Sequence, residues 1–161
     1  GELGSAVAAA AAAFNLDVRV AARPGGDTRA NRLPLDQLLG EADILTLHCP
    51  LTDETRNLIG ARELSMMKSD ALLINAARGG IVDEQALAEA LRNGVIGGAG
   101  VDVLTEEPPV HGNPLLAQDI PNLIVTPHIA WASREARQRL VNEIAEKIRA
   151  FQRGEERNRV V

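Results

Sequence analysis

The chain has 161 residues and a formal net charge of −5, with 45% hydrophobic and 24% charged residues. These values are typical of one globular domain with its own core, and the acidic balance argues against a nucleic-acid partner. No stretch is long and apolar enough to cross a membrane, and alanines 8–13 lack the basic region of a signal peptide. The single cysteine, Cys49, excludes an intramolecular disulfide and predicts a reducing, cytoplasmic location.

The first third of the chain predicts two helices and two strands. Six consecutive alanines favour a helix over 5–14, and the apolar pattern after it predicts a short strand over 18–22. A second helix is expected over 34–39, ending at Gly40, and an apolar strand over 44–47.

The middle of the chain continues the alternation of helix and strand. A helix is expected over 61–67 and a buried strand over 71–74. The next helix, 84–93, has Asp83 in the position of an amino-terminal cap and Gly94 where a carboxyl-terminal glycine belongs.

The last third begins with a glycine-rich strand expected over 96–103, and a proline-containing loop over 106–121 precedes another strand at 123–125. The final helix is expected over 133–151 and carries an apolar stripe at helical spacing, formed by Leu140, Ile144, Ile148 and Phe151. Strands that alternate with helices predict a Rossmann-type doubly wound parallel sheet, with ligands beyond the carboxyl ends of the strands.

The first four residues, Gly1-Glu2-Leu3-Gly4, precede the alanine-rich helix. A tight turn would explain them, but a dinucleotide fingerprint has glycines at this spacing, between a strand and a helix that binds the pyrophosphate. Gly1 and Gly4 fit the second and third glycines of that fingerprint. The first glycine and the first strand would then precede residue 1, so the sheet is expected to lack its first strand.

The end of the 18–22 strand has no acidic residue to bind the ribose hydroxyls of an adenosine. It reads Ala22-Arg23 instead, and Arg23 is either a solvated loop arginine or a partner for a 2′-phosphate, with Arg29 and Arg32 nearby. Because the acid is missing, the sequence favours NADP over NAD.

Polar side chains follow three of the later strands. Arg78 is followed by two glycines, and its planar guanidinium suits a carboxylate substrate, although a lone arginine after a strand is often only a surface residue. Asp102 ends the next strand, and a pair of glutamates follows it. His128 lies between the last strand and the last helix, where an imidazole paired with a carboxylate can donate a proton. His48 and His111 have simpler explanations as a strand-end residue and a loop residue.

In this order, these segments resemble the D-isomer-specific 2-hydroxyacid dehydrogenase family, and within it the glycerate dehydrogenase/hydroxypyruvate reductase branch. The resemblance covers nearly the whole chain and rests on residues 1–4, 48–52, 73–80, 98–103 with Glu107-Pro108, and 126–130. It implies an NAD(P)-dependent oxidoreductase that reduces a small 2-keto acid of the hydroxypyruvate or glyoxylate type to a D-2-hydroxy acid.

The resemblance also implies three catalytic roles. Arg78 would bind the carboxylate and the carbonyl oxygen of the substrate, and His128 would be the general acid for reduction and the base in the reverse direction. Glu107, rather than Glu106, would hold this histidine, because it directly precedes the proline. No metal site is implied.

The remaining implied contacts are to the cofactor. Asp102 would hold the nicotinamide carboxamide, and Trp131 is expected near the substrate or the cofactor. The other cofactor-binding residues would be Gly1, Glu2, Leu3 and Gly4 at the pyrophosphate, Arg23, Cys49 and Pro50 at the adenosine side, Ala76 and Ala77 at the nicotinamide ribose, and Arg78 and His128.

The resemblance also predicts the domain organisation. Residues 1–132 would form the nucleotide-binding domain, and residues 133–161 a helix and tail that pack toward a substrate domain outside these 161 residues. The isolated chain is then expected to be inactive, and the protein to form a homodimer. Because the same family includes corepressors, a nucleotide-sensing or interaction module without turnover is the alternative function.

Overall fold

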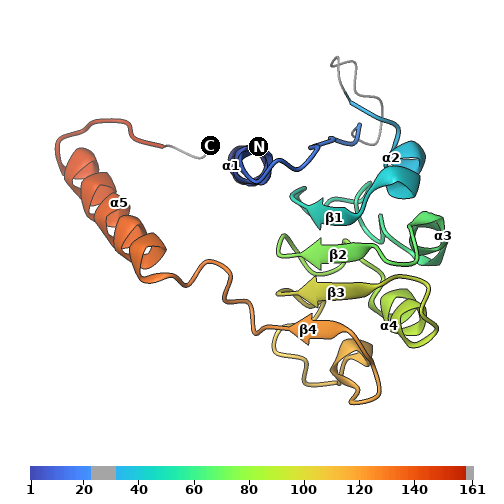
Figure 1. Cartoon of the computed structure of the whole chain (residues 1–161). Helices are drawn as coiled ribbons and strands as arrows, with labels where there is room; N and C mark the ends of the chain where they lie inside the picture. The colour runs from blue at the N-terminus through green and yellow to red at the C-terminus, as the bar shows by residue number, and fades with distance from the viewer. Residues whose placement is uncertain (23–31, 159–161) are drawn as a thin grey trace. The chain divides into compact units, whose positions relative to one another are not determined.

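The structure, a computed structural model, describes residues 1–22 and 32–158. It forms two compact units, Gly1–His128 and Ile129–Val161. The first unit contains a parallel sheet with the strand order β1-β2-β3-β4 (Figure 1). Its strands are β1 (Ile44–Leu47), β2 (Leu72–Asn75), β3 (Gly98–Val101) and β4 (Leu123–Val125).

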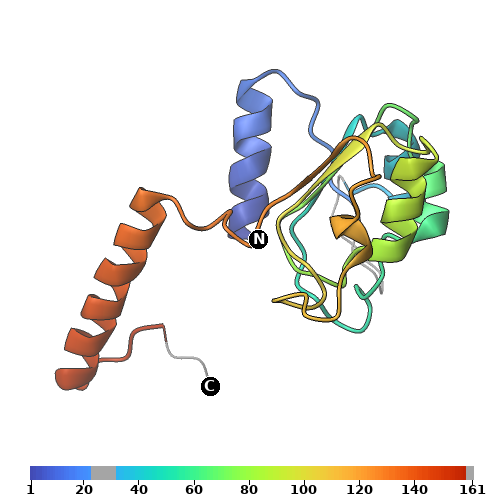
Figure 2. The same cartoon turned by 90° about the horizontal axis from the view of Figure 1, so that it is seen from below.

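Short helices precede or connect the parallel strands and cover one face of the sheet. They are α2 (Leu35–Glu41), α3 (Ala61–Met66), α4 (Glu84–Arg92) and the 3₁₀ turn η1 (Pro114–Leu116). Figure 2 shows α2, α3 and α4 together on one side of the sheet and α1 (Glu2–Ala13) on the other. The predicted α/β fold with a parallel sheet is therefore confirmed.

The predicted strand over 18–22 is wrong in extent. The described part of this segment makes one isolated parallel bridge, Ala21 with Leu33, through the Ala22 N–H to the Leu33 carbonyl and the Leu33 N–H to the Val20 carbonyl. A strand needs a hydrogen-bonded neighbour along its length, and among the described residues only Leu33 pairs with this segment. The predicted loop that follows lies outside the described residues at 23–31.

Two other predicted boundaries move for physical reasons. Gly40 lies inside α2 rather than ending it, and the helix stops where Ala42 becomes extended to enter β1. The strand predicted over 96–103 is reduced to Gly98–Val101, because the ladder with β2 covers only these four residues and the ladder with β4 lies within them. By contrast, Asp83 caps α4 through its side chain, and Gly94 follows this helix with a φ of 64°, both as predicted.

Aliphatic side chains form the core of the first unit between the sheet and the covering helices. The largest of those that are fully buried are Leu39, Ile59, Leu64, Leu73, Ile81, Leu87, Ile96 and Val103. Complete burial of one such side chain is worth about 1.5–3 kcal/mol. This core fixes the ends of the strands, from which the polar residues project.

The second unit is dominated by one helix, α5 (Arg134–Gln152). The Ser133 hydroxyl caps it by accepting a hydrogen bond of 3.1 Å from the Ala136 N–H. The apolar stripe of this helix is exposed at Leu140, Ile144, Ile148 and Phe151. In the described residues, no helix is long and apolar enough to span a membrane.

Candidate active site

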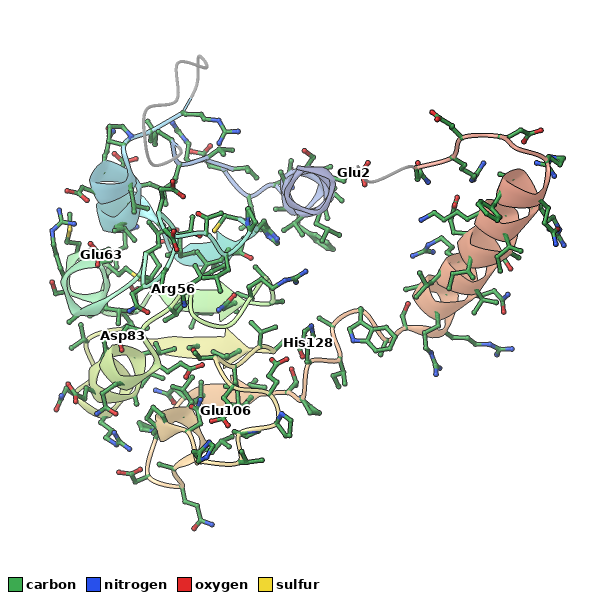
Figure 3. All side chains as sticks on the ribbon, turned by 180° about the vertical axis from the view of Figure 1, so that it is seen from behind. Glu2, Arg56, Glu63, Asp83, Glu106 and His128 are labelled. Carbon is green, nitrogen blue, oxygen red and sulfur yellow. The ribbon has the colours of Figure 1, made fainter. Side chains whose placement is uncertain are left out.

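The three predicted catalytic residues lie beyond the carboxyl ends of adjacent strands. Arg78 follows β2, Glu107 follows β3 and His128 follows β4. Figure 3 labels His128 where the last strand ends, and Glu106 on the neighbouring loop. Because all the strands run parallel, their carboxyl ends meet at one edge of the sheet, where ligands of such folds bind.

Glu107 and His128 are paired in the structure. The Nδ1 atom of His128 lies 2.7 Å from Oε2 of Glu107, and the Glu107 Oε1 atom accepts a hydrogen bond of 2.8 Å from the Leu104 N–H. The hydrogen bond from His128, followed by that from Leu104, lowers the pKa of Glu107 against the opposing effect of desolvation. An ionised carboxylate only accepts hydrogen bonds, so the imidazole donates to Glu107 through Nδ1.

The backbone of His128 is held in an unusual conformation. Its φ is 51°, in the left-handed region, and its N–H donates to the carbonyl oxygens of Asp102 (2.9 Å) and Thr126 (3.0 Å). Asp102 is itself buried and accepts a hydrogen bond of 2.5 Å from the Thr126 hydroxyl. Non-glycine residues with such backbones persist only where their surroundings hold them, and they concentrate at functional sites.

Arg78 lies on a tight loop that a buried asparagine shapes. Asn75 is 2% exposed; its side-chain amide donates to the Arg78 carbonyl, and its Oδ1 accepts from the Ala77 N–H, both at 3.1 Å. The Arg78 side chain is exposed and donates to the Ala77 carbonyl at 2.6 Å. Sequence reasoning assigns Asn75 no role; its signal is a polar residue at the end of an apolar strand.

A groove of about 350 Å³ brings together many of the predicted cofactor-binding residues. It is lined by Leu3, His48, Cys49, Pro50, Leu51, Ala76, Ala77 and Arg78. Desolvation raises the pKa of the Cys49 thiol and lowers the pKa of His48. His48, explained from the sequence as a strand-end residue, therefore also forms part of this wall, with its Nε2 3.0 Å from the Thr46 hydroxyl oxygen.

The amino terminus of α1 contributes to the groove and fits a phosphate ligand. The helix begins at Glu2, three residues before its predicted start, so Leu3 and Gly4 lie in its first turn. A Cβ atom on Gly4 would lie 3.3 Å from Cβ of His48, so glycine permits this close approach of helix and strand end. The first turn of a helix leaves backbone N–H groups without intrahelical partners, and such groups bind pyrophosphate.

Two further residues predicted to bind the cofactor are Arg23 and Trp131. Arg23 falls outside the described residues, as does Arg29. Trp131 belongs to the second unit, where its side chain is 55% exposed. Arg32 is described, and its guanidinium donates to the Ala21 carbonyl at 2.9 Å, close to the end of the segment where an acid is missing.

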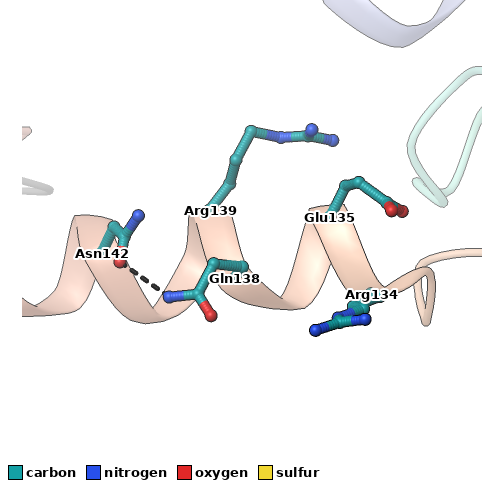
Figure 4. A pocket seen from close by; sticks show the side chains of 5 residues that line it. All are labelled: Arg134, Glu135, Gln138, Arg139 and Asn142. Atoms are coloured by element: carbon teal, nitrogen blue, oxygen red, sulfur yellow. Dashed lines mark hydrogen bonds between the residues drawn. The ribbon is translucent and has the colours of Figure 1, made fainter.

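A second hollow, of about 400 Å³, lies on the surface of α5 (Figure 4). Its lining comes from one helix alone, namely Arg134, Glu135, Gln138, Arg139 and Asn142. Because the lining of this hollow comes from a single helix, we place the functional site at the sheet edge, where several elements meet. Within the described ranges, no group of three or more His, Cys, Asp or Glu side chains could hold a metal ion.

Known proteins are similar to this chain in sequence and in fold. Residues 1–130 match the family model of the D-isomer specific 2-hydroxyacid dehydrogenase, NAD binding domain. A glycerate dehydrogenase of Methylorubrum extorquens is 54% identical over 124 residues, which are 77% of this chain and 40% of that protein. A glyoxylate reductase of Aeropyrum pernix is 43% identical over 159 residues, 96% of this chain and 47% of the relative. The chain therefore spans less than half of these relatives.

Solved structures show the same fold. The TT0316 protein of Thermus thermophilus has a TM-score of 0.86 and 44% identity, and the match covers all of this chain and 51% of that one. A D-lactate dehydrogenase with NAD+ from Lactobacillus jensenii has a TM-score of 0.85 and 35% identity, and the match covers 100% of this chain and 53% of that one. An acyclic imino acid reductase in complex with NADPH and D-Arg has a TM-score of 0.84 and 33% identity, and the match covers 100% of this chain and 51% of that one. The chain belongs to the D-isomer-specific 2-hydroxyacid dehydrogenase family, of which it contains the NAD-binding domain.

Proposed function

We propose that this chain is the nucleotide-binding and catalytic part of an oxidoreductase that reduces a small 2-keto acid to a D-2-hydroxy acid with NAD(P)H. The observation that carries the proposal is the Glu107–His128 pair, 2.7 Å apart at the sheet edge where Arg78 also emerges. The names of the relatives, glycerate dehydrogenase and glyoxylate reductase, support a substrate of the hydroxypyruvate or glyoxylate type.

The residues of the site divide the chemistry between them. A bound nicotinamide would supply the hydride, and the groove beside the first turn of α1 would hold the dinucleotide. Arg78 would bind the substrate carboxylate and offset negative charge on the keto oxygen. His128 would donate the proton from Nε2 to that oxygen, while Glu107 holds the opposite side of the ring. In the reverse direction the same nitrogen would accept the proton of the hydroxyl group.

Turnover by the complete gene product tests this function. The oxidation of NADH and of NADPH is followed with a panel of small 2-keto acids, and hydroxypyruvate or glyoxylate is expected to be reduced. Reduction of none of them, together with measurable nucleotide binding, would contradict the proposal and support the sensor or corepressor-like alternative.

We also propose that the cofactor is NADP rather than NAD. Ala22 stands at the end of the 18–22 segment, where a carboxylate would bind the ribose hydroxyls and repel a 2′-phosphate. Positive charge is available next to it, since the Arg32 guanidinium reaches the Ala21 carbonyl and Arg23 follows directly in the chain.

The proposal extends to the complete protein. Residues beyond this chain would supply a substrate-binding domain, and the apolar stripe of α5 would pack toward it. We further propose a homodimer in the cytoplasm, without nucleic-acid or membrane partners. The acidic composition argues against nucleic acid and the lone cysteine fits a reducing compartment, whereas the homodimer rests on the family resemblance alone.

A further inference from the structure

Glu84 ties together both ends of the loop that carries Glu107. It is the first residue of α4, and its side chain is turned toward the loop that follows β3. Oε1 accepts a hydrogen bond of 2.7 Å from the Thr105 N–H, and Oε2 accepts one of 2.7 Å from the side-chain amide of Asn113. One carboxylate thus spans two points eight residues apart, on either side of Glu107.

The backbone next to Arg78 contacts the other side of this loop. A Cβ atom on Gly79 would lie 1.9 Å from the Leu104 carbonyl oxygen, so the two backbones are in direct contact. The Leu104 N–H in turn donates to Glu107 at 2.8 Å. The stretch 78–84 therefore begins at Arg78, and its contacts through Gly79 and Glu84 fix the loop whose Glu107 carboxylate holds His128.

We propose that Glu84 is a positioning residue for His128 and acts through the loop that carries Glu107. The inference rests on the proposed function, because it assigns His128 the proton transfer. Losing either hydrogen bond to Glu84 frees one end of the loop, so that the Glu107 carboxylate is no longer held against the imidazole. Displacements of about 1 Å at such groups cost roughly 100-fold in rate.

Glu84 also lies in the first turn of α4, where a negative charge stabilises a helix. A purely structural role would therefore lower stability without affecting proton transfer. Asp83 offers the matched control, because its side chain caps the same helix by accepting a hydrogen bond of 3.0 Å from the Ala86 N–H, within the helix rather than from the loop. Asp83→Ala is expected to lower the Tm and to leave the pH profile of kcat unchanged.

The test exchanges donor and acceptor between two side chains in the complete protein. Glu84→Gln keeps one acceptor oxygen but turns an amide donor toward a second donor, and is expected to lower kcat about 10- to 100-fold. Asn113→Asp alone places its carboxylate against that of Glu84, and the two repel each other. The double variant restores the hydrogen bond with donor and acceptor exchanged, because the carboxylate at position 113 accepts from the amide at position 84. The carboxylate can also still accept from the Leu115 N–H, which lies 2.9 Å from Asn113 Oδ1 in the wild type.

The double variant is expected to recover kcat to within about threefold of the wild type, as coupled neighbours do. In Glu84→Gln alone, the pH profile of kcat is also expected to change, because the hydrogen bond from His128 that lowers the pKa of Glu107 is weakened. Asp102, Glu106 and His111 are further titratable groups around this loop. A Glu84→Gln variant with wild-type kcat and pH profile overturns the proposal, as does a double variant no better than the worse single one.

A readout without turnover separates this inference from the proposed function. The titration of the His128 ring is followed by nitrogen-15 NMR in the complete protein without substrate. Glu84→Gln is expected to change this titration, and Asp83→Ala to leave it as in the wild type. If the wild type fails to turn over any keto acid, the proposed function is wrong, yet an altered ring titration still supports the role of Glu84; an unaltered one refutes it.

Discussion

His128 combines a left-handed backbone, with φ of 51°, and a side chain held by Glu107. Asparagine tolerates this backbone better than most residues but cannot transfer a proton at this site, so His128→Asn removes the chemistry and spares the fold. We expect kcat to fall by about 100-fold or more in the complete protein, with little change in the Tm. Steady-state kinetics and thermal unfolding measure the two effects.

The control for this change is His111→Asn. His111 also lies 2.7 Å from a glutamate, Glu106, but on the exposed part of the same loop. The His111→Asn variant is expected to leave kcat within about threefold of the wild type, since exposed ion pairs contribute little to the stability of the loop. Equal losses in the two variants would remove the special role assigned to His128.

Ala22 carries the prediction on the cofactor. Ala22→Asp introduces the carboxylate that repels a 2′-phosphate and binds ribose hydroxyls, so the ratio of kcat/KM for NADPH over NADH is expected to fall by roughly tenfold or more, about 1.4 kcal/mol. The ratio is measured with one keto acid at saturation. An unchanged ratio means that position 22 does not face the adenosine ribose, and the argument for NADP then loses its main support.

At the residue scale, the sequence is most informative where a polar side chain follows an apolar strand. This pattern identifies Arg78 and His128, and the structure places both at the carboxyl edge. It cannot identify Glu84, because an acidic residue in the first turn of a helix is fully explained by helix stability. The contacts of Glu84 depend on a loop 21 residues away, which no local pattern reveals.

At the scale of elements, two glycines are expected to respond oppositely to alanine. Gly40 lies inside α2, and a Cβ atom on it would come no closer than 4.0 Å to a neighbour, the Met66 carbonyl oxygen. Gly40→Ala should therefore raise the free energy of unfolding by about 0.5–1 kcal/mol. Gly79→Ala would place a Cβ 1.9 Å from the Leu104 carbonyl oxygen, and should destabilise by at least about 1–3 kcal/mol. Chemical denaturation of both variants checks the contrast; destabilisation by Gly40→Ala would mean that α2 does need its glycine.

The elements that can be predicted are those whose own residues determine them. The strand over 44–47 and the cap of α4 at Asp83 depend on local apolar patterning and on a side-chain oxygen, and both are found. The segment 18–22 has the apolar pattern of a strand, but pairing is a property of two segments, and only one bridge forms in the part of the chain that is described. The predicted start of α1 is three residues late, because a glycine fingerprint favours a loop at Glu2 and Leu3.

At the scale of the whole molecule, alternation of the elements is enough to predict a parallel sheet. Each helix between strands is short, and a connection of this kind returns the chain to the same edge of the sheet, which forces parallel pairing. The same alternation cannot predict what covers α5, because the stripe along this helix is apolar whichever surface it meets.

The stripe of α5 gives the prediction for the complete protein. Ile144 is 48% exposed in this chain, and if a substrate-binding domain covers it, Ile144→Ala removes buried methyl groups and should lower the unfolding free energy by about 2 kcal/mol. Gln138, on the polar side of the same helix, is the control, and its change to alanine should stay within about 0.5 kcal/mol. The measurement is denaturant unfolding of the complete protein. If the stripe faces water instead, Ile144→Ala becomes neutral or slightly stabilising, because alanine is the better helix former, and the proposed packing of α5 is then wrong.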